Sequence, residues 1–166
     1  MIKDNEKLLL FVLISLMTAI LIYPFLHECG HYLVALVLKG KVIEFRILPT
    51  PYVLCDLSKN SNLERTAIGM AGNWFPIIIS MILPANNYVL KVFRIILKII
   101  SVFATVISFI SVRFLCNEQD DFFQIIRYWE YSKVSLVFIA AGSLMFSAYL
   151  LICEHPVKWL RTSFEI

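Results

Sequence analysis

The sequence is poor in charge. Only 16% of its 166 residues are Asp, Glu, Lys or Arg, and 60% are hydrophobic. An ordinary soluble domain carries roughly 25% charged residues. The Lys and Arg residues are scattered, so the net charge of +3 includes no basic block of the kind that binds nucleic acid. These shortages argue against a soluble domain and a nucleic-acid-binding protein, and they predict a single membrane-embedded domain, residues 1–166.

Paired cysteines are missing as well. The chain has four cysteines, and none forms a CxxC pair with another. The sequence therefore predicts neither a disulfide framework nor a zinc site of the cysteine type. It also contains no internal repeat and no low-complexity tract.

Long apolar runs, by contrast, are abundant. A bilayer core about 30 Å thick requires roughly 20 residues of helix. The runs predict an all-α polytopic membrane protein with about four transmembrane helices, at approximately residues 8–38, 66–84, 89–114 and 133–153. The first run is longer than the apolar core of a signal peptide and no small-residue cleavage site follows it, so we expect it to remain in the mature protein.

The apolar pattern changes after the first span. Ile43, Phe45 and Ile47 alternate with charged residues, which is the period of a β-strand. A Pro-Thr-Pro turn and a second short apolar stretch follow. We expect a small β-hairpin at the membrane surface over residues 41–57.

Two features of the predicted helices concern their shape and their surroundings. Pro24 lacks the backbone N–H that would bond the carbonyl of Ile20, so it predicts a kink in the first helix. Lys91, Arg94 and Lys98 share one face of the third helix. We interpret them as a stripe that faces lipid headgroups.

The first span also contains the motif HECGH. His27 and His31 lie four residues apart, so on a helix their imidazoles share one face and can hold a single zinc ion. Glu28 is displaced about 100° from His27, close enough to contact a water molecule on that metal without ligating it. This H-E-x-x-H spacing is typical of zinc hydrolases, in which the glutamate is the general base. The alternative is that the three side chains only hydrogen-bond neighbouring helices, but an ionised residue inside a membrane helix costs about 2.5 to 3.5 kcal/mol on insertion scales.

A catalytic zinc site requires a third protein ligand. The histidines lie near the end of the first span, and the third span returns the chain to their side of the membrane. The segment that then follows contains Glu118, Asp120 and Asp121. His155 follows the fourth span and falls on the opposite side. The topology therefore favours a carboxylate of this acidic segment as the third ligand.

Three segments together resemble the site-2 protease family, the intramembrane zinc metalloproteases, in a small form. The first is HECGH within a transmembrane segment. The second is GMAGN, residues 69–73, which has the spacing of the family's G-P-x-x-N element with Met70 in place of proline. The third is QDDFFQII, residues 119–126, which is similar to the family's L-D-G-x-x-[IL] segment with Phe122 in place of glycine.

The resemblance implies a third zinc ligand and a substrate contact. Aligning Ile125 and Ile126 with the family's aliphatic positions places Asp121 on the ligand, and Asp120 is the alternative. Asn73 would bind the substrate backbone, while a hydrogen bond between helices explains it equally well.

The sequence thus predicts a zinc-dependent endopeptidase that cleaves membrane-spanning substrates. One zinc ion, held by His27, His31 and Asp121, would activate a water molecule, and Glu28 would take its proton. The hairpin is expected to hold unwound substrate as an added strand. We expect a multi-pass protein of the cell membrane. The distribution of basic residues slightly favours an active site near its cytoplasmic side, as does the resemblance.

Two alternatives remain open. The first is a proteolytically inactive metal- or peptide-binding membrane protein of the same fold. The second is a structural membrane subunit in which HECGH is accidental. Zinc content distinguishes the structural subunit from the protease and from the inactive binding protein. Cleavage distinguishes the protease from the inactive binding protein.

Overall fold

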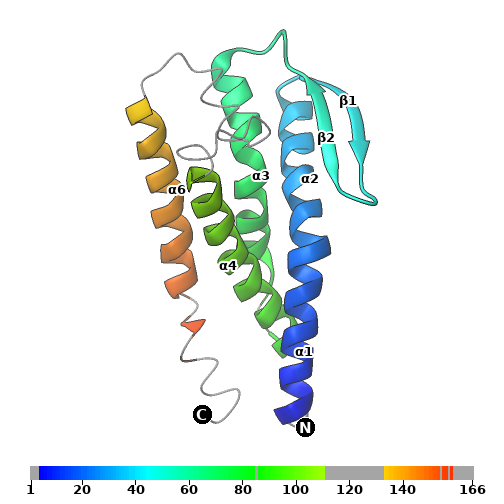
Figure 1. Cartoon of the computed structure of the whole chain (residues 1–166), viewed down its shortest axis with the longest axis vertical. Coiled ribbons are helices and arrows are strands. Elements are labelled where there is room, and N and C mark those ends of the chain that lie inside the picture. The colour runs from blue at the N-terminus through cyan, green and yellow to red at the C-terminus, as the bar shows by residue number, and fades with distance from the viewer. Residues whose placement is uncertain (1–3, 85, 111–132, 154, 157, 159–166) are drawn as a thin grey trace.

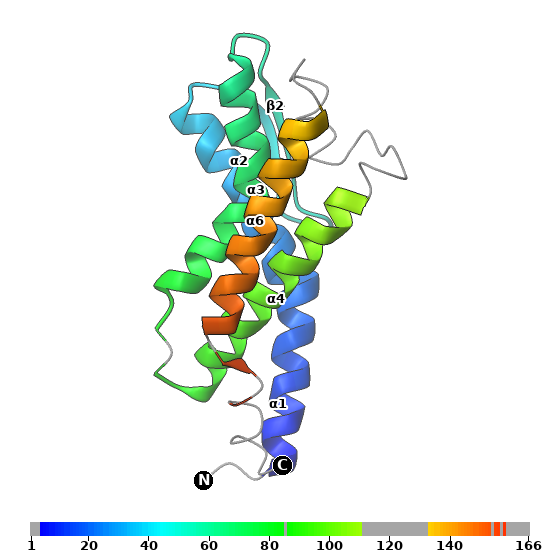
Figure 2. The same cartoon turned by 90° about the vertical axis from the view of Figure 1, so that its left-hand side faces the viewer.

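A computed structural model describes residues 4–84, 86–110, 133–153, 155, 156 and 158. This part of the chain is mostly helical, with one small antiparallel sheet. The long helices lie side by side, and the sheet lies on the outer side of the first of them (Figures 1 and 2). The expected helical fold with one hairpin is therefore confirmed for the described residues.

The first predicted span is a continuous helical run in three parts. They are α1 (Asp4–Met17), a π-turn η1 (Thr18–Ile22) and α2 (Tyr23–Val37). Among the described residues, Asn5–Val37 is the one helix long and apolar enough to cross a membrane. This finding is compatible with a membrane location.

The break predicted at Pro24 takes the form of that π-turn. The Tyr23 N–H donates to the carbonyl of Thr18, five residues back, where an α-helix would bond four residues back. Because Pro24 has no N–H, the α-helical ladder cannot pass through it unchanged, and the wider turn absorbs the break. The motif HECGH begins one turn later.

The predicted hairpin is confirmed. Strand β1 (Lys41–Arg46) pairs antiparallel with β2 (Tyr52–Asp56). The ladder has a bulge between Val42 and Glu44. Strand β2 lies between β1 and α2 (Figure 1), and the Tyr32 ring of α2 stacks on Phe45 of β1 with 4.9 Å between the ring centroids.

Three further helices complete the described fold. They are α3 (Asn62–Ile82), α4 (Tyr88–Ile110) and α6 (Lys133–Cys153). Their positions agree with the predicted helices, although the predicted third helix extends beyond the described residues. Helix α3 begins with a capping box, in which Ser61 and Glu64 each accept a hydrogen bond from the other's backbone N–H.

Helices α2 and α3 approach closely at Gly30. A Cβ atom at this position would lie 2.8 Å from the carbonyl carbon of Ala71 and 2.8 Å from the Cβ of Phe75. Only glycine allows the two backbones this separation. The close crossing brings α3 against the face of α2 that contains His31.

The interpretation of Lys98 as a headgroup-facing residue is wrong. Its exposed fraction is 4%, and it lies on the same buried face of α4 as Ile95, Ser101 and Thr105. The spacing that placed it in a basic stripe also places it with these buried residues, three and seven positions away. Arg94 is partly buried, and its guanidinium donates to the Leu83 carbonyl at 2.8 Å, at the end of α3.

Candidate metal centre

The two histidines of the motif converge. The Nε2 atoms of His27 and His31 are 3.1 Å apart, and their rings meet nearly at right angles, with 4.7 Å between the centroids. Two zinc–nitrogen bonds of ordinary length at a tetrahedral angle separate the nitrogen atoms by about 3.3 Å. The separation of the two nitrogen atoms is therefore close to that of two ligands of one zinc ion, and it also allows a hydrogen bond between the rings.

Helix α3 holds His31 in the orientation that a ligand requires. His31 is buried, and its Nδ1 lies 2.7 Å from the backbone carbonyl of Ile68. A carbonyl only accepts, so the Nδ1 atom donates and the neutral ring keeps the lone pair on Nε2. Such a hydrogen bond fixes the tautomer and the direction of a metal-binding imidazole.

Gly72 of α3 lies against both imidazoles, and the nearest of their atoms to a Cβ at this position is Nε2 of His31. A Cβ atom at Gly72 would lie 2.7 Å from Cε1 of His27 and 2.6 Å from Cε1 of His31. Both rings therefore pack against the backbone of Gly72, which has no side chain. The sequence indicated this residue only as part of GMAGN, and the structure shows which side chains need the space.

Asn73 follows Gly72 and is buried, with an exposed fraction of 3%. Its Oδ1 accepts a hydrogen bond from the Tyr23 hydroxyl at 3.3 Å, so the expected hydrogen bond between helices is present. Its Nδ2 is also buried and has no hydrogen-bond partner among the residues that the structure describes. The donation of this N–H to a substrate carbonyl stays a prediction.

Sequence reasoning missed Tyr23. The residue is buried, and its ring centroid lies 6.1 Å from that of His27. The signal was available, because Tyr23 precedes His27 by four residues and so lies on the same helical face. Its hydroxyl links the histidine-bearing helix to Asn73 of α3.

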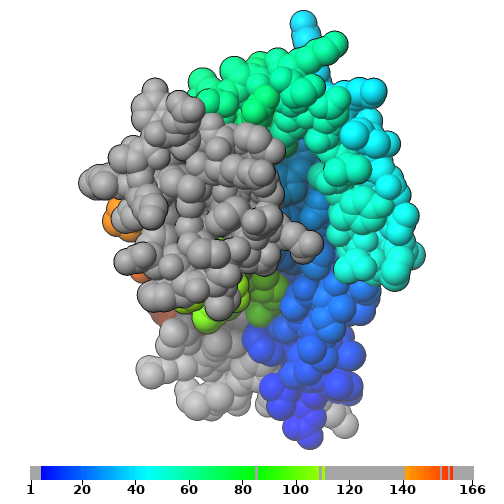
Figure 3. Space-filling view, turned by 45° about the horizontal axis from the view of Figure 1, so that its top comes forward, coloured from blue at the N-terminus to red at the C-terminus, as the bar shows by residue number. Residues whose placement is uncertain are grey.

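Glu28 points toward the hairpin. Its Oε2 accepts a hydrogen bond from the backbone N–H of Val53 at 2.9 Å. The space-filling view shows the hairpin lying directly against the first helix (Figure 3). The predicted general base and the predicted substrate-binding strand are thus in contact, which the sequence did not indicate.

Two cysteines lie within or near the motif, one on α2 and one on β2. Cys29 and Cys55 are free thiols. Burial, and then the charge of Glu28, raise the pKa of the Cys55 thiol above its ordinary value of 9.0. A raised pKa makes the thiolate, the form that zinc binds, harder to reach.

The expected third ligand is not tested by the structure. Asp121 and its alternative Asp120 lie within residues 111–132, outside the described part of the chain. Within the described part, no three residues of the types His, Cys, Asp and Glu gather into a group that could hold a metal. His155 is exposed, after the end of α6.

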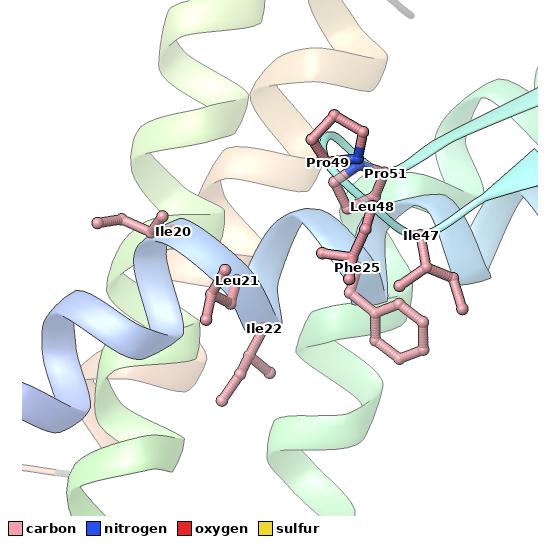
Figure 4. A pocket seen from close by; sticks show the side chains of 8 residues that line it. All are labelled: Ile20, Leu21, Ile22, Phe25, Ile47, Leu48, Pro49 and Pro51. Atoms are coloured by element: carbon pink, nitrogen blue, oxygen red, sulfur yellow. The ribbon is translucent and has the colours of Figure 1, made fainter.

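An apolar pocket of about 380 Å³ separates the hairpin tip from the first helix (Figure 4). Phe25 lines it from α2 and precedes Glu28 by three residues, so the two side chains share a helical face. The pocket therefore lies about one turn from the predicted general base. Its lining consists of Ile20, Leu21, Ile22, Phe25, Ile47, Leu48, Pro49 and Pro51.

Comparisons of the chain with protein-family models, with curated proteins and with solved structures gave no match.

Proposed function

We propose that this protein is a zinc-dependent endopeptidase of the membrane that hydrolyses peptide bonds of membrane-spanning substrates. The observation that carries the proposal is the 3.1 Å approach of the Nε2 atoms of His27 and His31. The carbonyl of Ile68 fixes the ring of His31 in one orientation, and Glu28 follows His27 in the sequence. This combination of two imidazoles and a carboxylate supports hydrolysis rather than a purely structural role.

Each residue of the site has a separate proposed role. His27, His31 and Asp121 are the proposed ligands of one zinc ion, with Asp120 as the alternative to Asp121. A zinc ion in this position would supply a Lewis acid and lower the pKa of water. Glu28 would take the proton of the attacking water and pass it to the leaving amine.

The peptide itself needs a separate set of contacts. The Nδ2 of Asn73 would donate to a substrate carbonyl, and the Tyr23 hydroxyl keeps the amide in place through Oδ1. A helix hides its own carbonyls, so a membrane-spanning substrate must unwind before it can be cut. The hairpin would then bind the unwound segment as an added strand.

A multi-pass arrangement is part of the proposal. Helices α3, α4 and α6 have 21, 23 and 21 residues, and roughly 20 residues of helix cross a bilayer core. Large apolar side chains remain exposed on several helices, as lipid contact requires. They include Leu9, Leu13, Ile20, Phe103, Ile107, Met145 and Ile152.

The helix contacts support the same arrangement. Small polar residues are buried where helices pack, among them Ser101, Thr105, Ser143 and Ser147, and membrane helices commonly associate through such residues. We place the active site near the cytoplasmic side of the cell membrane, following the slight excess of basic residues on that side.

We expect the purified full-length protein to contain one zinc ion per chain and to cleave a helical membrane substrate reconstituted with it. A chelator should remove the zinc and the cleavage together, and added Zn²⁺ should restore both, because the ion supplies the Lewis acid. His31→Ala should contain no zinc. Metal analysis and electrophoresis of the products provide the measurements, and a metal-free wild-type protein that still cleaves would refute the proposal.

A second expectation concerns the third ligand. Asp121→Asn should lower zinc affinity by more than about 100-fold, because losing a ligand exceeds the roughly 10- to 100-fold cost of losing a residue that only supports one. Asp120→Asn is the matched control and should change the affinity less than tenfold. Competition titration with a zinc indicator measures both. The opposite ranking would assign the ligand to Asp120.

A further inference from the structure

The outer edge of β2 faces the helix that contains the predicted general base. Val53 lies opposite Phe45 in the ladder, yet its N–H donates to Glu28 and not to β1. In an antiparallel ladder the N–H and C=O groups of alternate residues point away from the partner strand. Val53 is therefore an outward-pointing residue, and Leu54 points back toward β1.

A peptide that extends the sheet at this edge would need the same N–H. Adding a strand requires the outward N–H and C=O groups of the edge strand as its partners. Val53 is the second residue of the short strand β2, Tyr52–Asp56, so a peptide that pairs along the whole strand meets its N–H. Glu28 and an incoming peptide thus compete for one donor.

The pocket at the hairpin tip shows what kind of peptide fits this edge. Its volume of about 380 Å³ falls within the roughly 300–1,000 Å³ of ligand pockets. Its lining is apolar, with Phe25 on the helix side and Leu48 and Pro49 on the hairpin side (Figure 4). An extended segment along β2 could place an apolar side chain there, as a peptide from a membrane span would.

We propose that β2 latches the general base, and that an extended apolar peptide releases it by taking over the N–H of Val53. The inference rests on the proposed function and adds an order of events to it. While the edge of β2 is empty, the Glu28 carboxylate is tied to the hairpin. Once a peptide pairs with β2, the carboxylate gives up the N–H of Val53 and can turn to the attacking water, so that deprotonation of water is coupled to the presence of substrate.

The latch is tested first without any catalysis. Amide hydrogen exchange of the full-length protein in detergent micelles, followed by NMR, reports Val53 and Leu54 separately. Glu28→Ala should speed exchange of the Val53 amide at least tenfold and leave that of Leu54 within twofold. Glu28→Gln keeps an accepting oxygen and should remain close to wild type. Unchanged exchange at Val53 in Glu28→Ala would overturn the latch.

The release is tested by kinetics with a reconstituted membrane substrate. Val53→Pro deletes the outward N–H, and proline is tolerated at such an edge position because no ladder bond is lost. If the peptide takes this N–H, KM should rise at least tenfold and kcat should stay within threefold. Val53→Ala, which keeps the N–H, is the control and should change KM less.

The two measurements keep the proposals separate. A fall in kcat with unchanged KM in Val53→Pro would overturn the release, because the N–H would then be positioning Glu28 in the reacting complex. Unchanged values of both would overturn it as well. A wild-type protein that neither binds zinc nor cleaves would refute the proposed function, while the exchange of the Val53 amide would still report on the latch.

Discussion

Replacing Glu28 by Gln should abolish cleavage and leave zinc in place. Glutamine has the shape of glutamate but cannot accept a proton from water, so the step assigned to the carboxylate is lost. A positioned general acid–base group contributes about 10² to 10⁴ in rate, and a loss in this range is expected. The amide oxygen can still accept the N–H of Val53, so the hairpin contact seen in the structure is preserved.

The control for this variant is Glu44→Gln. Glu44 is a hairpin carboxylate that pairs with Arg46 at 2.9 Å across an exposed surface, away from the histidine pair. Its replacement should leave both zinc content and turnover near wild type. Equal turnover by Glu28→Gln and wild type would refute the assigned base. Bound zinc without cleavage in the wild type would favour the proteolytically inactive binding protein.

Gly72→Ala should lower zinc affinity by about 10- to 100-fold. This is the range observed when groups that orient metal ligands are removed. The added methyl group would lie 2.7 Å from His27 and 2.6 Å from His31 at their Cε1 atoms, so both rings would have to move. His31 cannot move without weakening its hydrogen bond to Ile68. Titration with a zinc indicator measures the effect.

Gly142→Ala is the matched control, because a Cβ atom there meets no atom of the described residues within 4 Å. Both substitutions replace a helical glycine by alanine, which favours the helix by about 1 kcal/mol. A weaker helix therefore cannot explain a loss of zinc in Gly72→Ala. Full zinc affinity in that variant would show that the metal does not bind between these two rings.

The local features of the fold were predictable because they depend on short spacings. The four-residue spacing from His27 to His31 places two imidazoles on one face of any helix, and the alternation around Phe45 is the period of a strand. Pro24 disturbs a helix wherever it occurs, although the sequence did not show that a π-turn would absorb the break. Helix positions agreed for the same reason, since apolar runs mark them.

Contacts between elements were harder to predict. The approach of Val53 to Glu28 depends on how the hairpin folds back over α2, which no local pattern encodes. Lys98 was misplaced because a basic stripe and a buried helical face have the same spacing, and only packing distinguishes them. The close packing of the two imidazoles against Gly72 likewise follows from the crossing of α2 and α3. Asp121 lies outside the described residues, so its role rests on the sequence alone.

The π-turn before the motif sets the rotational phase between the two halves of the first helix. Each residue advances a helix by about 100°, and a π-turn accommodates one residue more than the α-helical hydrogen-bond pattern. The half before Thr18–Ile22 packs on α4, while the half after it packs on α3. A uniform α-helix would turn His27 and His31 about 100° away from Gly72, so the orientation of the two proposed zinc ligands is set a full turn upstream of them.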